Sequence, residues 1–309
     1  MSFLAHQLIG EARRRQVRLW VDSTGELRFA GPAATLDERF VALLRAQAGP
    51  ITAKIGQDAP DRWLKPLTEG DGDLLLYLIP AAGAGPGAYR AWTSAAPAGL
   101  RIEAVLTPGR EERFGEAPFT DVAALADRIA EQILRHADRP FGIFGHSTGA
   151  LVAREVTRRL SGSTSDQLAL FVAGALPPHL VSGPSHEPTD DELLAHLNAW
   201  QGTPAELLAD TEFLRTFLPT LRADLRLFAS CHREVSPAER VDVPVTALGG
   251  LHDETAPEGH CEAWHPWAAG AFRTRMVEGG HFFPVTAARE VLDEVVRELG
   301  HRRAEPTRT

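Results

Sequence analysis

The stretch that decides the fold runs from residue 141 to residue 160 and reads FGIFGHSTGALVAREVTRRL. Its first four residues are an aliphatic and aromatic run typical of a buried strand, and the residues from Ala150 to Leu160 have the spacing of an amphipathic helix. Between them lies Gly145-His146-Ser147-Thr148-Gly149, whose two glycines leave room for a sharp turn and close helix packing. The sequence therefore predicts a strand, a tight turn and a helix, with the Ser147 hydroxyl presented at the helix N-terminus.

Further strands and helices are expected on both sides of this stretch. The candidate strands are 74–79, 102–106, 141–144, 168–173, 243–248 and 272–277. Amphipathic segments fit between most of them, and the clearest spans residues 123–136 after Thr120. Alternating strands and helices predict an α/β fold with a mostly parallel sheet covered by helices on both faces.

The turn at Ser147 predicts a nucleophile that needs a base and an acid later in the chain. Asp253 follows the strand VPVTALGG, at the end of the sheet where open α/β folds keep their sites, and His281 lies in the Gly-rich stretch EGGHFF. We therefore expect Ser147, Asp253 and His281 to be catalytic. Glu254 and Asp242 remain alternatives for the acid.

An acyl-transfer site also needs two backbone N–H groups that bind the oxyanion. The residue after the nucleophile, Thr148, supplies one, and we expect Ala82, in the loop after the first strand of the sheet, to supply the other. That loop lacks the spacing of a dinucleotide fingerprint. No established zinc-ligand spacing is present in the cluster of potential ligands formed by His252, Asp253, His260, Cys261 and His265. We therefore expect neither a metal nor another cofactor.

The composition of the chain excludes several classes of protein. Its 309 residues carry a net charge of −9, which argues against nucleic-acid binding, and only two cysteines, which favours a reducing cytoplasm over a disulfide framework. No apolar run approaches the ~20 residues of a membrane helix. The first twenty residues include Arg13, Arg14 and Arg15 but no apolar segment of a secretory signal. We expect a cytoplasmic protein that binds neither nucleic acid nor membrane.

The N-terminal residues differ in character from the rest. Residues 1–56 carry a net charge of +3 and the remainder −12, so we expect a small domain over 1–56, a linker over 57–73 and a large domain over 74–303. Alternating apolar residues predict a β-hairpin over 17–30. Thr35, with Glu38 three residues later, predicts the capped start of a helix, so the small domain has an α-β-β-α-α pattern.

Residues 74–300 resemble the type II thioesterases of polyketide and nonribosomal peptide synthesis. The resemblance is carried by PAAG at 80–83, YRAW at 89–92, PGREERF at 108–114, the Ser147 turn, LGG at 248–250 and GGHFF at 279–283. It implies an α/β-hydrolase fold, a helical lid over about 177–240, and catalytic roles for Ser147, Asp253 and His281. Thr148 and Ala81 depart from the residues usual in that family, which affects substrate fit rather than the N–H donors.

The resemblance implies hydrolysis of acyl thioesters on the phosphopantetheine arms of acyl or peptidyl carrier proteins, which edits or unblocks a synthase. An offloading thioesterase and a general carboxylesterase are the alternatives. A non-catalytic adaptor is a further rival, and a complete Ser, Asp and His set argues against it.

Residues 3–55 resemble the tubulysin-synthetase-type (TubC-like) docking domains of nonribosomal peptide and hybrid polyketide synthetases, above all in VRLW at 17–20 and LRF at 27–29. The resemblance implies a homodimer that binds the C-terminal tail of an upstream synthase subunit on its hairpin. An exposed strand edge can pair with an extended peptide, and Arg18, Trp20 and Arg28 are the expected partner-binding residues. The alternative is that the hairpin is only a solvated basic surface.

Overall fold

A computed structural model describes most of the chain. The chain divides into two compact units, Met1–Arg62 and Trp63–Thr309. The described residues are 8, 11–12, 15, 17–21, 26–31, 35–52, 63–69, 72–164, 166–183, 187–193, 215–257 and 259–304. Within these residues, no helix has the length and apolar character needed to cross a membrane.

The larger unit is built on a seven-stranded sheet of order β3-β5-β4-β6-β7-β8-β9. The strands are β3 (Leu64–Pro66), β4 (Leu74–Ile79), β5 (Leu100–Val105), β6 (Phe141–His146), β7 (Gln167–Ala173), β8 (Val245–Gly250) and β9 (Phe272–Val277). All neighbours pair in parallel except the edge strand β3, which is antiparallel to β5. The mostly parallel sheet expected from the sequence is confirmed.

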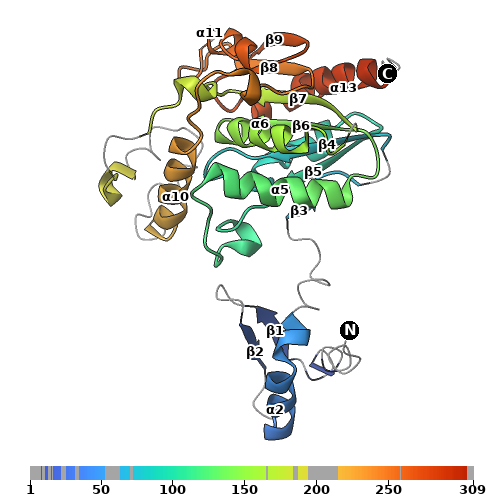
Figure 1. Cartoon of the computed structure of the whole chain (residues 1–309), viewed down its shortest axis with the longest axis vertical. Helices are drawn as coiled ribbons and strands as arrows, with labels where there is room; N and C mark the ends of the chain where they lie inside the picture. The colour runs from blue at the N-terminus through green and yellow to red at the C-terminus, as the bar shows by residue number, and fades with distance from the viewer. Residues whose placement is uncertain are drawn as a thin grey trace. The chain divides into compact units, whose positions relative to one another are not determined.

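Helices cover both faces of this sheet (Figure 1). The α-helices are α4 (Ala91–Ala95), α5 (Val122–His136), α6 (Thr148–Leu160), α10 (Leu218–Ala229), α11 (Gly259–Glu262), α12 (Phe283–Thr286) and α13 (Ala288–Ala304). The 3₁₀ turns are η2 (Pro86–Tyr89), η3 (Glu111–Arg113), η4 (Pro178–Leu180), η5 (Pro237–Glu239) and η6 (His265–Trp267). Helices α5 and α6 pack together on one face, and α4 and α13 on the other.

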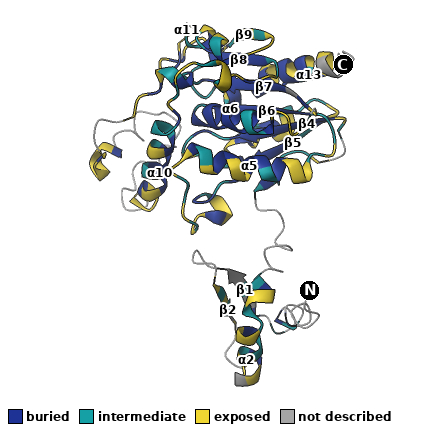
Figure 2. Cartoon of the chain, in the orientation of Figure 1, coloured by how far each residue is buried: buried dark blue, intermediate teal, exposed yellow. Residues whose placement is uncertain are grey.

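The central strands are apolar on both sides because both faces of the sheet are covered. Every residue of β4 and β6 is buried, and Figure 2 shows the buried residues concentrated in the sheet and on the inner sides of its helices. Leu75 and Tyr77 face the α5 and α6 side, whereas Leu76 and Leu78 face the side where Trp92 and α13 lie. The sheet is therefore a rigid platform for the loops at its carboxyl edge.

The segment 57–73 differs from the linker expected there. Residues 64–66 form β3, which pairs with β5 in the register Leu64↔Val105, and the Trp63 ring packs edge-on against Phe119 at 5.9 Å between centroids. A three-residue strand has no hydrophobic period long enough to be recognised in the sequence. The part of the segment beginning at Trp63 therefore belongs to the larger unit.

The N-terminal unit contains the expected hairpin, formed by β1 (Arg18–Val21) and β2 (Leu27–Ala30), and the helix α2 (Glu38–Ala46). The hairpin is antiparallel, with Trp20 opposite Arg28. The expected helix cap is wrong: Asp37, not Thr35, is the N-cap, and its side chain accepts a hydrogen bond from the Phe40 N–H at 2.8 Å. A carboxylate directly before the helix satisfies the free N–H more closely than a threonine two residues earlier.

The small core of this unit consists of Leu8, Ala12, Val17, Phe40, Leu44 and Ile51. The turn 22–25 and most of the first expected helix lie outside the described residues, as do the side chains of Arg18 and Trp20. The Arg28 side chain is exposed and pairs with Glu26 at 3.0 Å.

Candidate active site

Ser147 occupies a strained turn between β6 and α6. Its backbone has φ 55° and ψ −125°, a conformation that is costly for a residue other than glycine and is typical of functional sites. A Cβ at position 145 would collide with the backbone of Gly149 and Ala150, and one at position 149 with the backbone at Ile79. The two glycines therefore make the turn possible, and the tight turn expected from the sequence is confirmed.

The loops after β8 and β9 bring a carboxylate and an imidazole to this serine. His281 Nε2 lies 3.1 Å from Ser147 Oγ, and His281 Nδ1 lies 2.9 Å from Asp253 Oδ2. Ser147 and Asp253 lie 134 and 28 positions before His281 in the chain, and the three side chains form one hydrogen-bonded row. The imidazole can accept the serine proton at Nε2 while the carboxylate holds the proton on Nδ1.

Asp253 is buried and fixed by Thr255, a residue that the sequence analysis did not single out. Its Oδ1 accepts from the Thr255 hydroxyl at 2.7 Å and from the Thr255 N–H at 2.9 Å. Burial raises the pKa of Asp253, but the hydrogen bonds from His281 and Thr255 outweigh it and lower the pKa to about 2. The Asp-x-Thr spacing is a turn pattern that could have indicated this contact.

His146, inside the serine turn, is fully buried beneath the site. Its Nδ1 lies 2.8 Å from the Tyr89 hydroxyl, and its Nε2 lies 2.9 Å from the backbone carbonyl of His281. Burial and the nearby His281 lower the pKa of His146 to about 3. The ring is therefore neutral and ties the serine turn to the His281 loop.

The loop after β4 contains a residue, Ala82, that lines a cavity next to Thr148. The Ala81 N–H donates to the Tyr89 hydroxyl at 3.1 Å, and the Gly83 N–H donates to Asp224 at 2.6 Å. Among the described residues, the N–H groups of Ala82 and Thr148 have no hydrogen-bond partner, and both residues line the same cavity. This arrangement leaves two donors for an oxyanion.

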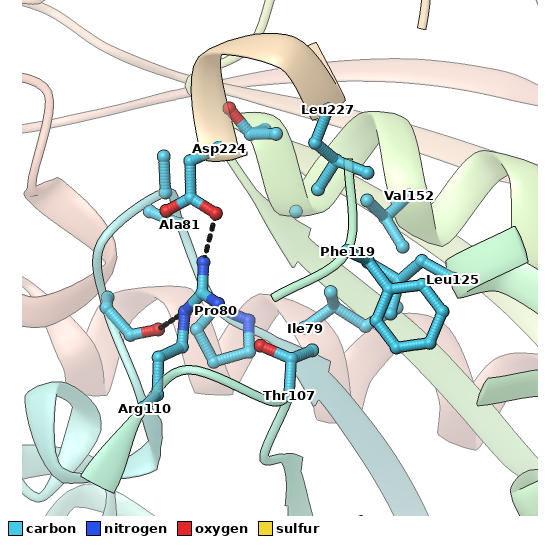
Figure 3. A pocket seen from close by; sticks show the side chains of 14 residues that line it. Ile79, Pro80, Ala81, Thr107, Arg110, Phe119, Leu125, Val152, Asp224 and Leu227 are labelled. Atoms are coloured by element: carbon cyan, nitrogen blue, oxygen red, sulfur yellow. Dashed lines mark hydrogen bonds and ion pairs between the residues drawn. The ribbon is translucent and has the colours of Figure 1, made fainter. Parts of the chain in front are cut away.

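The cavity beside these donors is small and mainly apolar (Figure 3). It has a volume of about 30 Å³, enough for a group the size of a water molecule or a methyl. Arg110 and Asp224 form one side, and the opposite side is formed by Phe119, Leu125, Val152 and Leu227. Leu227 and Asp224 both come from α10, so this helix closes the cavity.

The alternatives for the acid lie away from the serine row. Glu254 is exposed, and Asp242 accepts a hydrogen bond from Ser161. Across the part of the chain that the structure describes, no group of three or more His, Cys, Asp or Glu residues could hold a metal ion.

A serine, an imidazole and a buried carboxylate at the carboxyl edge of a mostly parallel sheet define the class of serine hydrolases with the α/β-hydrolase fold. The thioesterase domain family matches residues 75–302. The chain therefore belongs to the thioesterase family.

Individual relatives match most of this chain. The linear gramicidin dehydrogenase LgrE of Brevibacillus parabrevis is 35% identical over 233 residues, which cover 73% of this chain and 88% of LgrE. The structure of YbtT, a type II thioesterase of the yersiniabactin NRPS/PKS pathway, superposes with a TM-score of 0.71 at 29% identity and covers 78% of this chain and 99% of YbtT. In sequence and fold, this chain is thus similar to type II thioesterases of nonribosomal peptide and polyketide pathways.

One relative extends into the N-terminal unit. The AMB antimetabolite synthetase AmbE of Pseudomonas aeruginosa is 34% identical over 293 residues, which cover 94% of this chain and 13% of AmbE. That share of the chain exceeds the larger unit and therefore includes part of residues 1–62.

Proposed function

We propose that this protein hydrolyses acyl thioesters on the phosphopantetheine arms of carrier proteins and thereby edits a polyketide or nonribosomal peptide synthase. The observation that carries the proposal is the continuous row from Asp253 through His281 to Ser147, next to two free N–H groups. The relatives support the choice of a carrier-bound thioester over a simple ester.

In the proposed reaction, Ser147 Oγ attacks the thioester carbonyl while His281 Nε2 takes its proton. The Ala82 and Thr148 N–H groups stabilise the negative charge on the carbonyl oxygen. The tetrahedral intermediate collapses, and the carrier thiol leaves with the proton from His281. Asp253 keeps the other proton of the imidazole on Nδ1 throughout.

The second half of the reaction uses the same groups. His281 takes a proton from water, and the resulting hydroxide attacks the acyl-Ser147 ester. The ester bond breaks, Ser147 recovers its proton from His281, and a carboxylic acid is released. The carrier protein is left with a free thiol, which allows a blocked synthase to resume.

The test is intact-protein mass spectrometry of carrier proteins loaded with acetyl, propionyl and long-chain acyl groups. We expect the wild type to remove the acyl mass, Ser147→Ala to leave it in place, and Ser94→Ala, which changes an exposed serine on α4, to act as the wild type. Faster removal of the acetyl and propionyl groups than of the long-chain acyl group supports editing, and the reverse supports offloading. Cleavage of a simple ester with every carrier thioester intact would favour the carboxylesterase instead.

We also propose that residues 1–56 form a docking domain that binds the C-terminal tail of a synthase subunit and can form a homodimer. Within the described residues β1 pairs only with β2, so the hairpin offers a strand edge to an extended peptide. Arg28 lies on it, exposed, opposite Trp20. The alignment with AmbE supports an association of this unit with a synthetase.

Calorimetry with a synthetic tail peptide tests the docking proposal. Arg28→Glu is expected to weaken binding of an acidic tail, whereas Arg45→Glu, an exposed change on α2, leaves it unchanged. Removal of residues 1–56 is expected to abolish binding and to leave turnover of a free acyl thioester nearly unchanged. Equal tail affinity with and without these residues would contradict docking.

A further inference from the structure

Asp224 is a buried carboxylate on α10 that has no role in the proposed reaction. Its side chain is 2% exposed, and that of its ion-pair partner Arg110 is 11% exposed. One carboxylate oxygen pairs with Arg110, and the other accepts the Gly83 N–H at 2.6 Å. A buried charge is stable only with such partners. Asp224 thus connects α10 to the backbone of the loop that follows β4.

Arg110 strengthens this connection from the other side. Its Nε donates to the carbonyl of Ala84 at 3.1 Å, and its Nη1 donates to the carbonyl of Pro108 at 3.1 Å. Figure 3 shows the Arg110 side chain between this loop and Asp224. The guanidinium therefore holds the loop and orients the carboxylate that holds Gly83.

The anchors lie on both sides of Ala82. The Tyr89 hydroxyl accepts the Ala81 N–H, and Asp224 accepts the Gly83 N–H. These two hydrogen bonds fix the direction of the Ala82 peptide between them. Gly83 has φ 72°, in the region that only glycine enters without strain. The loop conformation thus depends both on this glycine and on the distant partners of the two N–H groups.

We propose that Asp224 is a positioning residue for the oxyanion site: it aims the Ala82 N–H, and it does so only while α10 is docked. The inference rests on the proposed function and adds a link between the lid segment and catalysis. A displacement of α10 that admits an acyl-pantetheine arm removes the acceptor of the Gly83 N–H. Closure restores it, so that the oxyanion site is complete only when the acyl group is covered.

The test compares Asp224→Ala and Asp224→Asn with Thr220→Val in the full-length protein. Thr220 lies one turn before Asp224 on the buried side of α10, and its hydroxyl donates to the Gly109 carbonyl at 3.2 Å. Thr220→Val therefore removes a buried contact between α10 and a neighbouring loop without touching Gly83. Asp224→Asn keeps an oxygen that can accept the Gly83 N–H and loses the ion pair.

A misplaced oxyanion donor weakens binding of the transition state more than binding of the substrate. We expect Asp224→Ala to lower kcat by about 10- to 100-fold with little change in KM. Affinity for a trifluoromethyl ketone, which forms a tetrahedral adduct with a serine, should fall by the same factor. Amide hydrogen exchange in residues 80–90 should become faster. Thr220→Val should leave kcat, ketone affinity and amide exchange unchanged. Asp224→Asn should give values between those of the wild type and Asp224→Ala.

Labelling with a fluorophosphonate separates this inference from the proposed function. If the wild type is neither labelled at Ser147 nor active on thioesters, the proposed function fails. If the wild type is labelled and active while Asp224→Ala matches Thr220→Val in kcat and ketone affinity, the positioning role is overturned. Should Asp224→Ala not fold, Arg110→Met decides: it releases the carboxylate from its ion pair, and an unchanged kcat would overturn the inference equally.

Discussion

The hydroxyl of Tyr89 lies 2.8 Å from Nδ1 of His146, in the interior beneath the serine turn. Because the His281 carbonyl can only accept, Nε2 of the neutral His146 ring carries the proton and donates it to this carbonyl at 2.9 Å. Nδ1 of His146 then accepts the proton of the Tyr89 hydroxyl, whose oxygen accepts the Ala81 N–H. One hydrogen-bonded chain therefore joins the loop after β4, the serine turn and the His281 loop.

Tyr89→Phe breaks this chain at its centre. It leaves the Ala81 N–H and His146 Nδ1 buried without partners, so we expect the free energy of unfolding to fall by about 2 kcal/mol and kcat to fall as the loop loses its anchor. Tyr77→Phe is the matched control, because the Tyr77 hydroxyl is buried and, within the described residues, has no hydrogen-bond partner. Urea unfolding should show no loss for Tyr77→Phe. Equal losses for the two variants would contradict the assigned chain.

Asp253→Asn tests how the imidazole of His281 is held. The amide group would favour the proton on Nε2 of His281, where it cannot accept the serine proton, so we expect kcat to fall on the order of 10³- to 10⁴-fold. The pKa of Asp253 is lowered to about 2, so the carboxylate is ionised at neutral and mildly acidic pH. The acid limb of a kcat/KM profile should therefore not report Asp253. A Thr255→Val variant with unchanged activity would show that Thr255 is not needed.

Glu155, which lies outside the Ser147 row, should make the free energy of unfolding depend on pH in acid. It is buried with Arg154, which its Oε2 contacts at 2.7 Å. Burial raises the pKa of Glu155, but hydrogen bonds from Arg158 and Arg159 and the charge of Arg154 outweigh it and lower the pKa from 4.5 to about 2. The unfolded chain therefore takes up the proton first as the pH falls.

The resulting stabilisation is fully present above about pH 4.5 and is lost as the pH falls to about 2, and it amounts to about 3 kcal/mol. Glu155→Gln should remove this part of the pH dependence in urea unfolding between pH 7 and pH 3. The half-exposed Glu131 on α5, changed in the same way, should not. An identical slope for Glu155→Gln and the wild type would contradict the assignment.

Local patterns were sufficient to predict the parts of the fold that repeat. β4 and β9 have the expected bounds, because an apolar run or an alternation ends at each boundary. The strand, turn and helix around Ser147 could also be predicted, since the two glycines that permit the turn are adjacent to it in sequence. The row of Ser147, His281 and Asp253 lies where strand ends of a parallel sheet must meet.

Contacts created only by tertiary folding could not be predicted. Gly83 and Asp224 are 141 positions apart, and nothing in the periodicity of α10 distinguishes a buried carboxylate from an exposed one. β3 was missed because three residues form no recognisable pattern. Asp37 was missed as the N-cap of α2 because threonine and aspartate are both preferred at that position, and Thr35 has Glu38 three residues later. Thr255 alone had a local signal, its spacing from Asp253.

Leu227 on α10 should limit the size of the acyl groups that fit the cavity. Its side chain closes the cavity of about 30 Å³ beside the Ala82 and Thr148 N–H groups, which we expect to receive the first carbons of the acyl chain. Leu227→Ala enlarges this space, so the ratio of kcat/KM for hexanoyl over acetyl N-acetylcysteamine thioesters should rise on the order of tenfold. Leu221→Ala is the matched control, because Leu221 is buried on the same helix in a separate cluster with Leu193 and Leu218. Both variants should lose about 2 to 4 kcal/mol of stability, which separates cavity size from a general loosening of α10. The same ratio in both variants would show that the acyl chain binds elsewhere.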